Sequence, residues 1–492
     1  QNTELLLKEL TLEEKCALLS GAETFKTRGM PKHGIPQIWL SDGPHGLREA
    51  GGGERPLGLN PTRARHLLPH GSAIANSWDA ALGEEIGAAL GEEAAAQEVS
   101  VVLGPGLNMK RNPLCGRSFE YFSEDPYLAG KLAAGYIRGI QSKGVVAAEA
   151  LCRQQSGNAA YGFGFHRGRA HLREIYLTGF EIAVKEGHPR SIMSSYNLVN
   201  GTYANENKHL LMEILRGEWG FDGAVITDWG GSNDHALGVK NGSTLEMRAR
   251  RDSVRELLAA VESGKITEAD IDARLSELLP LVFDTKLRWT LPRVSLIGSH
   301  HALARRAAAE SLVLLKNEGS LLPLAAGSKV ASSRLCQESA LPGAGSSMVN
   351  STQVDVLLDK LIDSELNVIG YQQGFDRHGK PDAALQNPPA NWRHRRIQLF
   401  CAWVWMKSLR VRGLTAAICA LRNQVDLLQA VAAVNPKIVV VLYSGSVVET
   451  PWLDNCQALL YAALGGQAGG AVADALTGKV NPCGKLAETS AV

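Results

Sequence analysis

A carboxylate at position 228 follows an apolar run in a way that suits catalysis. Residues 223–231 read GAVITDWGG, so small and β-branched residues lead directly to Asp228, Trp229 and two glycines. A run of this kind predicts a buried parallel strand that ends at Asp228. In α/β barrels the catalytic groups lie at the carboxyl-terminal ends of such strands. The simpler alternative is that Asp228 caps the next helix.

Other strands of the same half are also predicted to end in polar groups. Asp42 follows the short apolar run Ile38–Leu40, with Arg48 close behind it, and Tyr196 follows the predicted strand Ser191–Ser195. Because parallel strands present their carboxyl ends at one edge, these side chains are expected to share a site with Asp228. Because several strand ends are expected to carry polar groups to one edge, we favour a functional site over helix capping as the role of Asp228.

A neutral, polyhydroxylated substrate would suit these groups. Carboxylates and guanidiniums bind sugar hydroxyls in bidentate geometry, an aromatic ring packs under the sugar, and glycoside cleavage uses two carboxylates. Arg117 adds a further guanidinium from the long polar loop of residues 104–126. Structural alternatives remain for single residues: Arg117 can pair with Glu120 or Glu124, and Trp229 can belong to the core.

Helices and strands alternate along the first half of the chain. Helices are predicted at 3–20, 75–98, 128–142, 174–185, 208–219 and 267–279, and strands at 38–40, 101–103, 191–195 and 223–227. This alternation with mostly short connections is typical of a parallel α/β barrel, although a doubly wound sheet would show it too. Thr11 and Thr267 are predicted N-caps, and Pro280 is expected to end the last helix.

The composition changes after about residue 285. A helix at 302–309 and strands at 312–315, 437–442 and 459–464 predict a second α/β domain. We therefore expect a first domain over 1–285, a linker over 286–310 and a second domain over 311–492, as a chain of 492 residues exceeds one ordinary core. The glycine-rich GGQAGG of residues 465–470 lacks the downstream acid and spacing of a dinucleotide-binding loop.

Charge and cysteine usage narrow the classes of partner. Lys+Arg 51 against Asp+Glu 50 gives no field to attract nucleic acid or an anionic membrane. The eight cysteines show no CxxC pair and no histidine at metal spacing, so we interpret them as free thiols and predict neither a metal nor a cofactor. With no membrane-spanning run and no signal segment in residues 1–10, a cytoplasmic location is expected, with a removed leader left open.

Several segments together resemble glycoside hydrolase family 3, the β-glucosidases. They are SDGPHGLR (41–48), GPGLNMKRNPLCGRSFEYFSEDPYLAG (104–130), MSSYN (193–197), ITDWGGSNDH (226–235), AAAESLVLLKNEGSLLPL (307–324), GAGSSMVN (343–350), and VVETPWLD with GKVNPCGKLAET (within 447–489). The resemblance implies a (β/α)8-type barrel domain followed by an α/β sandwich domain, with the active site between them. The resemblance also implies that the family's fibronectin-like third domain would follow, and we expect it to be absent.

The resemblance also implies an activity and roles for particular residues. It implies a retaining β-glycosidase that acts on a small β-glucoside or oligosaccharide and needs no cofactor; the oligomeric state is not indicated. Asp228 matches the family's nucleophile. The residues that match its sugar-binding positions are Asp42, Arg48, Arg117, Tyr196 and Trp229.

Two segments depart from the family pattern at functional positions. After Val145–Ala148, where the family has a Lys-His-Phe sugar-binding motif, the chain reads EALCRQQS over 149–156. Where the family has its general acid within an acidic stretch of the second domain, the chain reads FCAWVWMKSLRVRG over 400–413, which contains no carboxylate. If these residues are real, the alternative is a catalytically impaired carbohydrate-binding homologue that lacks the acid/base Glu.

Codon arithmetic indicates a different origin for these departures. Trp and Met have single codons, so WVWMK (403–407) read from the third base must give Gly, then Leu, Met or Val, then Asp and Glu, which is the family motif. Read from the second base, residues 149–167 permit KHFAANNRETRRMVSDSI, again the family pattern. We hypothesise compensated reading-frame slips, in the gene or in its recorded sequence. The atypical segments are 62–70, 149–167, 335–343 and 391–420.

Overall fold

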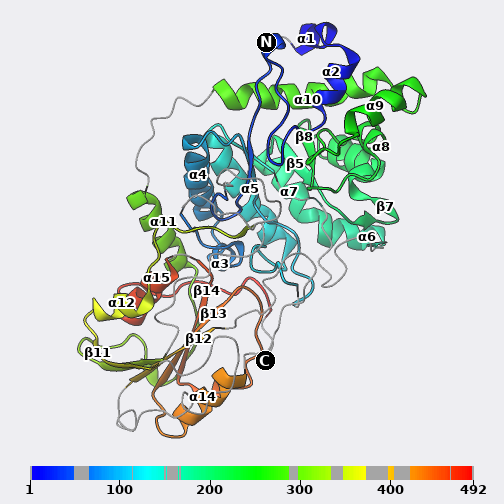
Figure 1. Ribbon diagram of the computed structural model, residues 1–492. Helices are drawn as coiled ribbons and strands as arrows, with labels where there is room; N and C mark the ends of the chain where they lie inside the picture. The colour runs from blue at the N-terminus through cyan, green and yellow to red at the C-terminus, as the bar shows by residue number, and fades with distance from the viewer. Residues whose placement is uncertain are drawn as a thin grey trace. The chain divides into compact units, whose positions relative to one another are not determined.

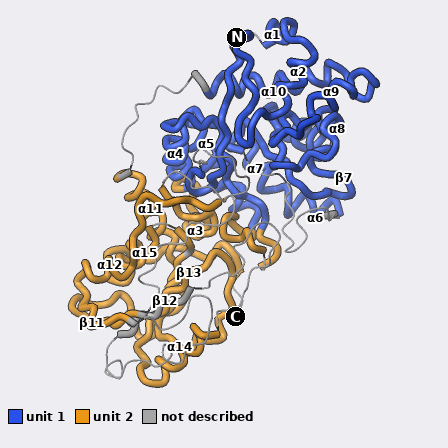
Figure 2. The backbone as a smooth tube through the Cα atoms, viewed as in Figure 1, with its two compact units in different colours: residues 1–61, 83–109, 125–296 blue, residues 62–82, 110–124, 297–492 orange. Residues whose placement is uncertain are grey.

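The structure, a computed structural model, forms two compact units. It describes residues 3–48, 66–113, 115–148, 151, 164–165, 168–287, 297–333, 347–372, 397–403, 422–465 and 467–489. The first unit comprises residues 1–61, 83–109 and 125–296, and the second comprises 62–82, 110–124 and 297–492 (Figure 2). Two segments from early in the chain therefore belong to the second unit.

Short parallel strands form the centre of the first unit. They are β1 (Leu40–Asp42), β2 (Val101–Leu103), β3 (Val146–Ala147), β5 (Ser191–Ser194) and β8 (Ala224–Thr227). β1, β2 and β3 pair in parallel in that order, and β5 pairs in parallel with β8. Between the two groups, Leu151 N donates to Met193 O at 2.7 Å and the Ser191 hydroxyl donates to Ala147 O at 3.1 Å.

Two irregular segments close these strands into a ring. Residues 244–247 lie between β8 and residues 19–21, and the chain after residue 21 turns back to pair with the region of β1. The closing hydrogen bonds, donor first, are Thr227 N to Leu245 O (3.0 Å), Gly21 N to Glu246 O (3.0 Å) and Leu40 N to Phe25 O (2.8 Å). The barrel prediction is confirmed, because a doubly wound sheet would have two open edges.

Helices surround this ring, as Figure 1 shows for α7, α8, α9 and α10 around β5 and β8. Their bounds are α1 (Thr3–Glu9), α2 (Leu12–Leu18), α4 (Ala80–Ala96), α5 (Pro126–Ser142), α6 (Arg169–His171), α7 (Thr178–Gly187), α8 (His235–Lys240), α9 (Ser253–Glu262) and α10 (Glu268–Leu287). Two further segments, Leu172–Leu177 and His209–Glu218, are π-helical. A small sheet of β4 (Gly164–Phe165), β6 (Leu198–Val199) and β7 (Thr202–Tyr203) lies outside the ring strands.

The two predicted caps form, but one helix is longer than its sequence signals indicate. Thr11 and Glu14 make a reciprocal capping box at α2, and Thr267 bonds reciprocally with Asp270 at the start of α10. The prediction that this helix ends before Pro280 is wrong, because α10 continues to Leu287. Leu281 and Val282 beyond the proline are 2% and 3% exposed. Burial of apolar side chains on both sides outweighs the hydrogen bond that proline removes.

The second unit is built on a six-stranded sheet in the order β11-β10-β12-β13-β14-β9. The strands are β9 (Val313–Asn317), β10 (Lys329–Ser333), β11 (Asn367–Gln372), β12 (Ile397–Trp403), β13 (Ile438–Ser444) and β14 (Ala458–Ala463). All neighbours are parallel except β9, which pairs antiparallel with β14 at one edge. β13 is buried throughout, as expected for a strand covered on both faces.

Helices cover both faces of this sheet. The unit contains α3 (Gly71–Asn76), α11 (Ile297–Glu310), α12 (Leu357–Ile362), α14 (Arg422–Ala432) and α15 (Ala468–Leu476). α12 connects β10 to β11 in one direction along the sheet, and α14 connects β12 to β13 in the other. Right-handed crossovers in opposite directions place their helices on opposite faces. The predicted α/β sandwich is therefore confirmed.

The glycine-rich segment at the start of α15 serves close packing. A Cβ atom at Gly469 would lie 2.3 Å from Asp355 O, and one at Gly470 would lie 2.2 Å from Asp355 Oδ2. The Asp355 side chain is 2% exposed and pairs with His301 at 3.3 Å and Lys360 at 3.4 Å. The glycines thus let α15 approach a buried, charge-paired carboxylate.

The described residues also bear on membrane crossing and thiol chemistry. No helix among them combines the length and apolar character needed to cross a membrane. Among the cysteines whose side chains are described, Cys16, Cys456 and Cys483 are free thiols, as predicted. Burial raises the pKa of the Cys16 thiol to about 12 and that of Cys456 to about 11. Thiols of such high pKa are poor nucleophiles at neutral pH.

Candidate active site

The ring brings several of the predicted site residues to one edge. Asp42 is the last residue of β1, Asp228 directly follows β8, and Tyr196 lies just beyond β5. Since these strands run parallel within one closed ring, their carboxyl-terminal ends lie at the same edge of the barrel. Within the first unit these strand ends therefore lie at one edge of the ring, and a shared site for their side chains stays a prediction.

The Asp228 carboxylate is held in a defined orientation at its strand end. Its side chain is buried, and Oδ1 accepts a hydrogen bond from the Trp229 amide at 2.8 Å. Its backbone is fixed on both sides, because Asp228 N donates to Ser194 O at 3.2 Å and Asp228 O accepts from Gly231 N at 2.8 Å. A carboxylate constrained in this way approaches a reacting carbon with little reorganisation.

The alternative that Asp228 caps the following helix is wrong. α8 begins at His235, and its N-cap is Asp234, whose Oδ1 accepts from Leu237 N at 2.8 Å. The Lys265 ammonium lies 2.6 Å from the other oxygen of Asp234. The capping role thus belongs to a different acid of the same loop.

Trp229 and Tyr196 hold each other beside Asp228. The Tyr196 hydroxyl donates to Trp229 O at 2.8 Å, and the Trp229 indole N–H donates to the carbonyl of Thr24. The indole packs against Phe25 with ring centroids 5.1 Å apart, and it is half-buried against the barrel core. Trp229 therefore combines core packing with a place at the site. Thr24 and Phe25 carry no sequence signal, because they lie in an irregular closing segment.

Asp42 and Arg48 are brought together by a compact turn. Arg48 N donates to Asp42 O at 2.9 Å, which closes the turn on itself. Gly43 has φ of 150°, and a Cβ there would lie 2.5 Å from Gly46 O, so the close approach requires glycine. The Tyr136 hydroxyl donates to Pro44 O at 2.6 Å and anchors the turn to α5.

Arg117 belongs to the second unit and forms one of its two expected ion pairs. Its guanidinium pairs with Glu120, whose side chain also accepts from the Ser347 hydroxyl. The Arg117 guanidinium carbon lies 5.5 Å from the centroid of the Tyr121 ring. Glu124 instead binds Thr489, so the i,i+3 partner is the correct one of the two alternatives.

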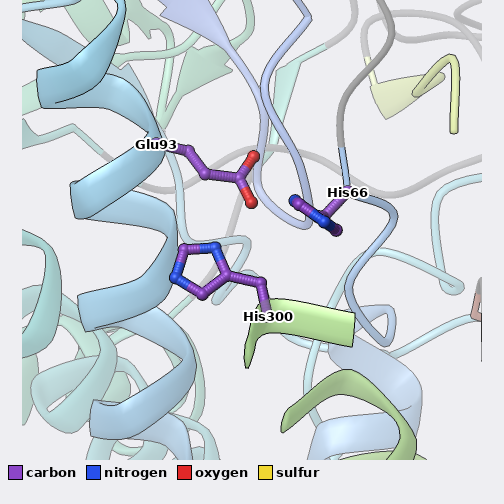
Figure 3. A group of neighbouring side chains, drawn as sticks. All are labelled: His66, Glu93 and His300. Atoms are coloured by element: carbon purple, nitrogen blue, oxygen red, sulfur yellow. The ribbon is translucent and has the colours of Figure 1, made fainter. Parts of the chain in front are cut away.

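Two histidines of the second unit meet beside α11. The rings of His66 and His300, drawn in Figure 3, contact edge to face. Their centroids lie 5.5 Å apart. Figure 3 also labels Glu93, a buried residue of α4 in the first unit.

The two departures from the family pattern lie largely outside the described residues. Of residues 149–167, only Leu151 and the two-residue strand β4 are described, and residues 335–343 are outside entirely. Of residues 391–420, only the backbone of β12 is described; its last residue, Trp403, pairs in register with Tyr443. The segment expected to carry the general acid, residues 400–413, overlaps the second half of β12 and continues beyond it.

Comparison with known proteins matches the two halves of the chain to domains of one family. The Glycosyl hydrolase family 3 N terminal domain matches residues 28–281, and the Glycosyl hydrolase family 3 C-terminal domain matches residues 312–492. Thermostable beta-glucosidase B of Acetivibrio thermocellus is 39% identical over 98% of this chain and 65% of its own length. Exo-alpha-(1->6)-L-arabinopyranosidase of Bifidobacterium longum is 35% identical over 99% of this chain and 67% of its own length. The chain thus spans about two thirds of these relatives.

Solved structures give the same result. The GH3 beta-glucosidase of Bifidobacterium adolescentis has a TM-score of 0.88 at 35% identity, covering 98% of this chain and 70% of that one. Beta-glucosidase 3B of Thermotoga neapolitana, solved in complex with alpha-D-glucose, has a TM-score of 0.88 at 30% identity, covering 100% of this chain and 76% of that one. Since both halves match one family in sequence and in fold, the chain belongs to glycosyl hydrolase family 3.

Proposed function

We propose that this chain is a retaining β-glycosidase that hydrolyses terminal non-reducing β-D-glucosyl residues. The observation that supports it most is the buried Asp228 carboxylate at the end of β8, oriented by the Trp229 amide. Relatives named β-glucosidase and a similar structure solved with glucose support the substrate class. No metal or cofactor is needed for this chemistry.

In the proposed reaction Asp228 is the nucleophile. One of its oxygens attacks the anomeric carbon and the aglycone leaves, which gives a covalent glycosyl-enzyme that water then hydrolyses. The bond from Trp229 N to Oδ1 holds the carboxylate ready for this attack. A Glu of the second domain, encoded by the restored reading frame of residues 400–413, would protonate the leaving oxygen and later activate water.

The remaining site residues would bind the sugar. Asp42 would accept bonds from sugar hydroxyls, and the guanidiniums of Arg48 and Arg117 would donate them. The Trp229 indole would offer a flat apolar surface to the ring. Tyr196 would act through Trp229, because its hydroxyl is bonded to the Trp229 carbonyl.

A second function follows if the printed residues 400–413 are real. That segment contains no carboxylate, so the protein would lack its acid/base and would be a carbohydrate-binding homologue. General acid catalysis typically contributes about a hundredfold to ten-thousandfold in rate, so poorly activated glycosides would lose that factor. Aryl glucosides with good leaving groups would lose less.

Assays with nitrophenyl β-glucoside beside cellobiose test both functions. We expect turnover of both by the wild-type protein and loss of both in Asp228→Asn, which removes the nucleophile but keeps the shape. Asp222→Asn is the matched control, because Asp222 is exposed just before β8 and should be silent. Sugar binding without turnover would favour the impaired homologue. Undiminished turnover by Asp228→Asn would exclude the nucleophile assignment.

The choice of sugar is tested on a panel of aryl glycosides. The relatives include enzymes named for β-glucosides and one named for an α-L-arabinopyranoside. We expect the highest kcat/KM on the β-D-glucoside, with the β-D-xyloside and α-L-arabinopyranoside below it. A reversed order would move the proposal to another sugar and leave the Asp228 mechanism in place.

A further inference from the structure

A short segment near the end of the second unit, Lys485–Thr489, lies against the loop that carries Arg117. We call this segment the 485–489 strap. Ala487 O accepts from the Ser123 hydroxyl at 2.5 Å and from Glu124 N at 3.4 Å. Thr489 donates to Glu124 Oε1 twice, from N at 2.8 Å and from Oγ1 at 2.5 Å. The strap is thus hydrogen-bonded to the carboxyl-terminal end of the 110–124 loop.

The amino-terminal end of the same loop is held by an ion pair. Lys110 Nζ donates to Glu488 Oε1 at 3.1 Å, and the two side chains are only 3% and 12% exposed. Lys110 N also donates to Ser123 O at 3.3 Å, which ties the two ends of the loop together. Because this pair is shielded from water, salt screens the attraction between its two charges only weakly. Removal of one partner leaves the other charge uncompensated.

The strap is bonded on its other side to α3 and the residues that follow it. Lys485 N donates to Asn76 O at 2.8 Å, and Ala487 N donates to Asn76 Oδ1 at 3.1 Å. The Trp78 indole donates to Lys485 O at 3.1 Å. The strap is therefore fixed independently of the loop and offers it a rigid base.

Packing also fixes the middle of the loop. A Cβ atom at Gly445 would lie 2.3 Å from Phe119 Cβ, so the loop rests directly on the end of β13. Ser72 N donates to Phe119 O at 3.3 Å. Between this contact and the clamped amino-terminal end lies Arg117, paired with Glu120. Because the Phe119 contact holds the loop on the carboxyl-terminal side of Arg117, freedom at the amino-terminal end would be transmitted to the Arg117 guanidinium.

We infer that the 485–489 strap positions Arg117 for sugar binding, with Glu488 and Thr489 as positioning residues. The kinetic part of this inference rests on the proposed glycosidase function. Its structural part, that the strap restrains the 110–124 loop, does not. Glu488 and Thr489 touch the loop and are assigned no contact with the sugar.

Hydrogen–deuterium exchange of the 110–124 peptides tests the restraint. In Glu488→Gln the Lys110 charge loses its partner, and we expect exchange of these amides to be faster by roughly tenfold or more. The charge-exchanged double variant Lys110→Glu with Glu488→Lys should restore slow exchange. Lys479→Met is the matched control, because Lys479 is exposed in the same part of the chain. Thr489→Ala, a milder change, decides the question should Glu488→Gln not fold.

Kinetics on nitrophenyl β-glucoside test the link to Arg117. We expect Glu488→Gln to raise KM several-fold with a smaller change in kcat, and the charge-exchanged variant to recover it. Exchange that equals wild type in the folded variants would overturn the inference. Faster exchange with unchanged KM would overturn the positioning role. A wild-type protein without turnover would refute the proposed function, while the exchange comparison would still decide the restraint.

Discussion

At the scale of single residues, Asp228 depends on hydrogen bonds that hold the end of β8. Thr227, which precedes it, has a fully buried hydroxyl that donates to Met247 O and accepts from Met247 N, both at 2.8 Å. Gly230 N in turn donates to Met247 O at 3.2 Å. One hydroxyl therefore joins β8 to the segment that closes the ring.

Replacement of this hydroxyl by a methyl group should be costly. Thr227→Val keeps the shape of the side chain but removes the hydroxyl that bonds to the backbone N–H and carbonyl of Met247. We therefore expect a loss of about 1–3 kcal/mol in the free energy of unfolding. Urea unfolding measures it. Thr285→Val is the control, because that buried hydroxyl donates to the carbonyls of Leu281 and Val282 within its own helix, α10, and within the described part of the chain joins no other segment to it. Equal losses in the two variants would contradict this account.

Some contacts of the candidate site could be predicted from the sequence around a single residue, and others could not. The apolar run before Asp228 predicted its strand end, and Glu120 was one of the two partners expected for Arg117. The carbonyl of Thr24 and the ring of Phe25, which hold the Trp229 indole, could not be predicted. They approach Trp229 only through ring closure, which leaves no local pattern.

At the scale of elements, the cap of α2 shows how a local motif creates pH dependence. A hydrogen bond from Lys32, followed by one from the Thr11 amide, lowers the pKa of Glu14 to about 2. The folded protein therefore binds this proton more weakly than the unfolded chain. The stabilisation is fully present above the ordinary pKa of 4.5 and is lost as the pH falls through about 2.

Glu14→Gln should remove this dependence. We expect the difference in unfolding free energy between wild type and Glu14→Gln to be constant above about pH 5.5 and to shrink toward about pH 2. Urea unfolding at a series of pH values measures it. Glu13→Gln serves as the control, because Glu13 is exposed in the same turn. A difference that stays constant down to low pH would show that Glu14 keeps its ordinary pKa.

Element types were predicted well where the pattern was local. β2 was predicted at its observed bounds, and both threonine caps were found, because a cap and a short apolar run are complete within a few residues. The π-helical geometry of His209–Glu218 and the passage of α10 through Pro280 were missed. The passage of α10 through Pro280 depends on the burial of Leu281 and Val282, which overrides the local preference.

At the scale of the whole molecule, the division into units depends on contacts between distant parts of the chain. Residues 62–82 and 110–124 belong to the second unit although they precede most of the barrel. Asn76 and Glu124 show why, because both are bonded to the 485–489 strap. No local composition marks such partners, so a sequence-based division at about residue 285 had no means of including them.

The atypical segments make a prediction about the whole protein. If they are reading-frame slips in the recorded sequence, the intact mass will differ from the 52.8 kDa calculated for the printed chain. Peptides from 149–167 and 391–420 should then match the shifted frame, including a Lys-His-Phe motif and a carboxylate beyond β12. Peptides that match the printed residues would establish real divergence and favour the impaired homologue.

The most direct test of the central claim is to trap the glycosyl-enzyme. A 2-deoxy-2-fluoro β-glucoside with a good leaving group should glycosylate the protein and turn over slowly, because the fluorine disfavours the oxocarbenium-like transition states. Peptide mass spectrometry should then find the sugar on the peptide that contains Asp228, with no label in Asp228→Asn. A label on another carboxylate, or hydrolysis without a covalent intermediate, would contradict the account.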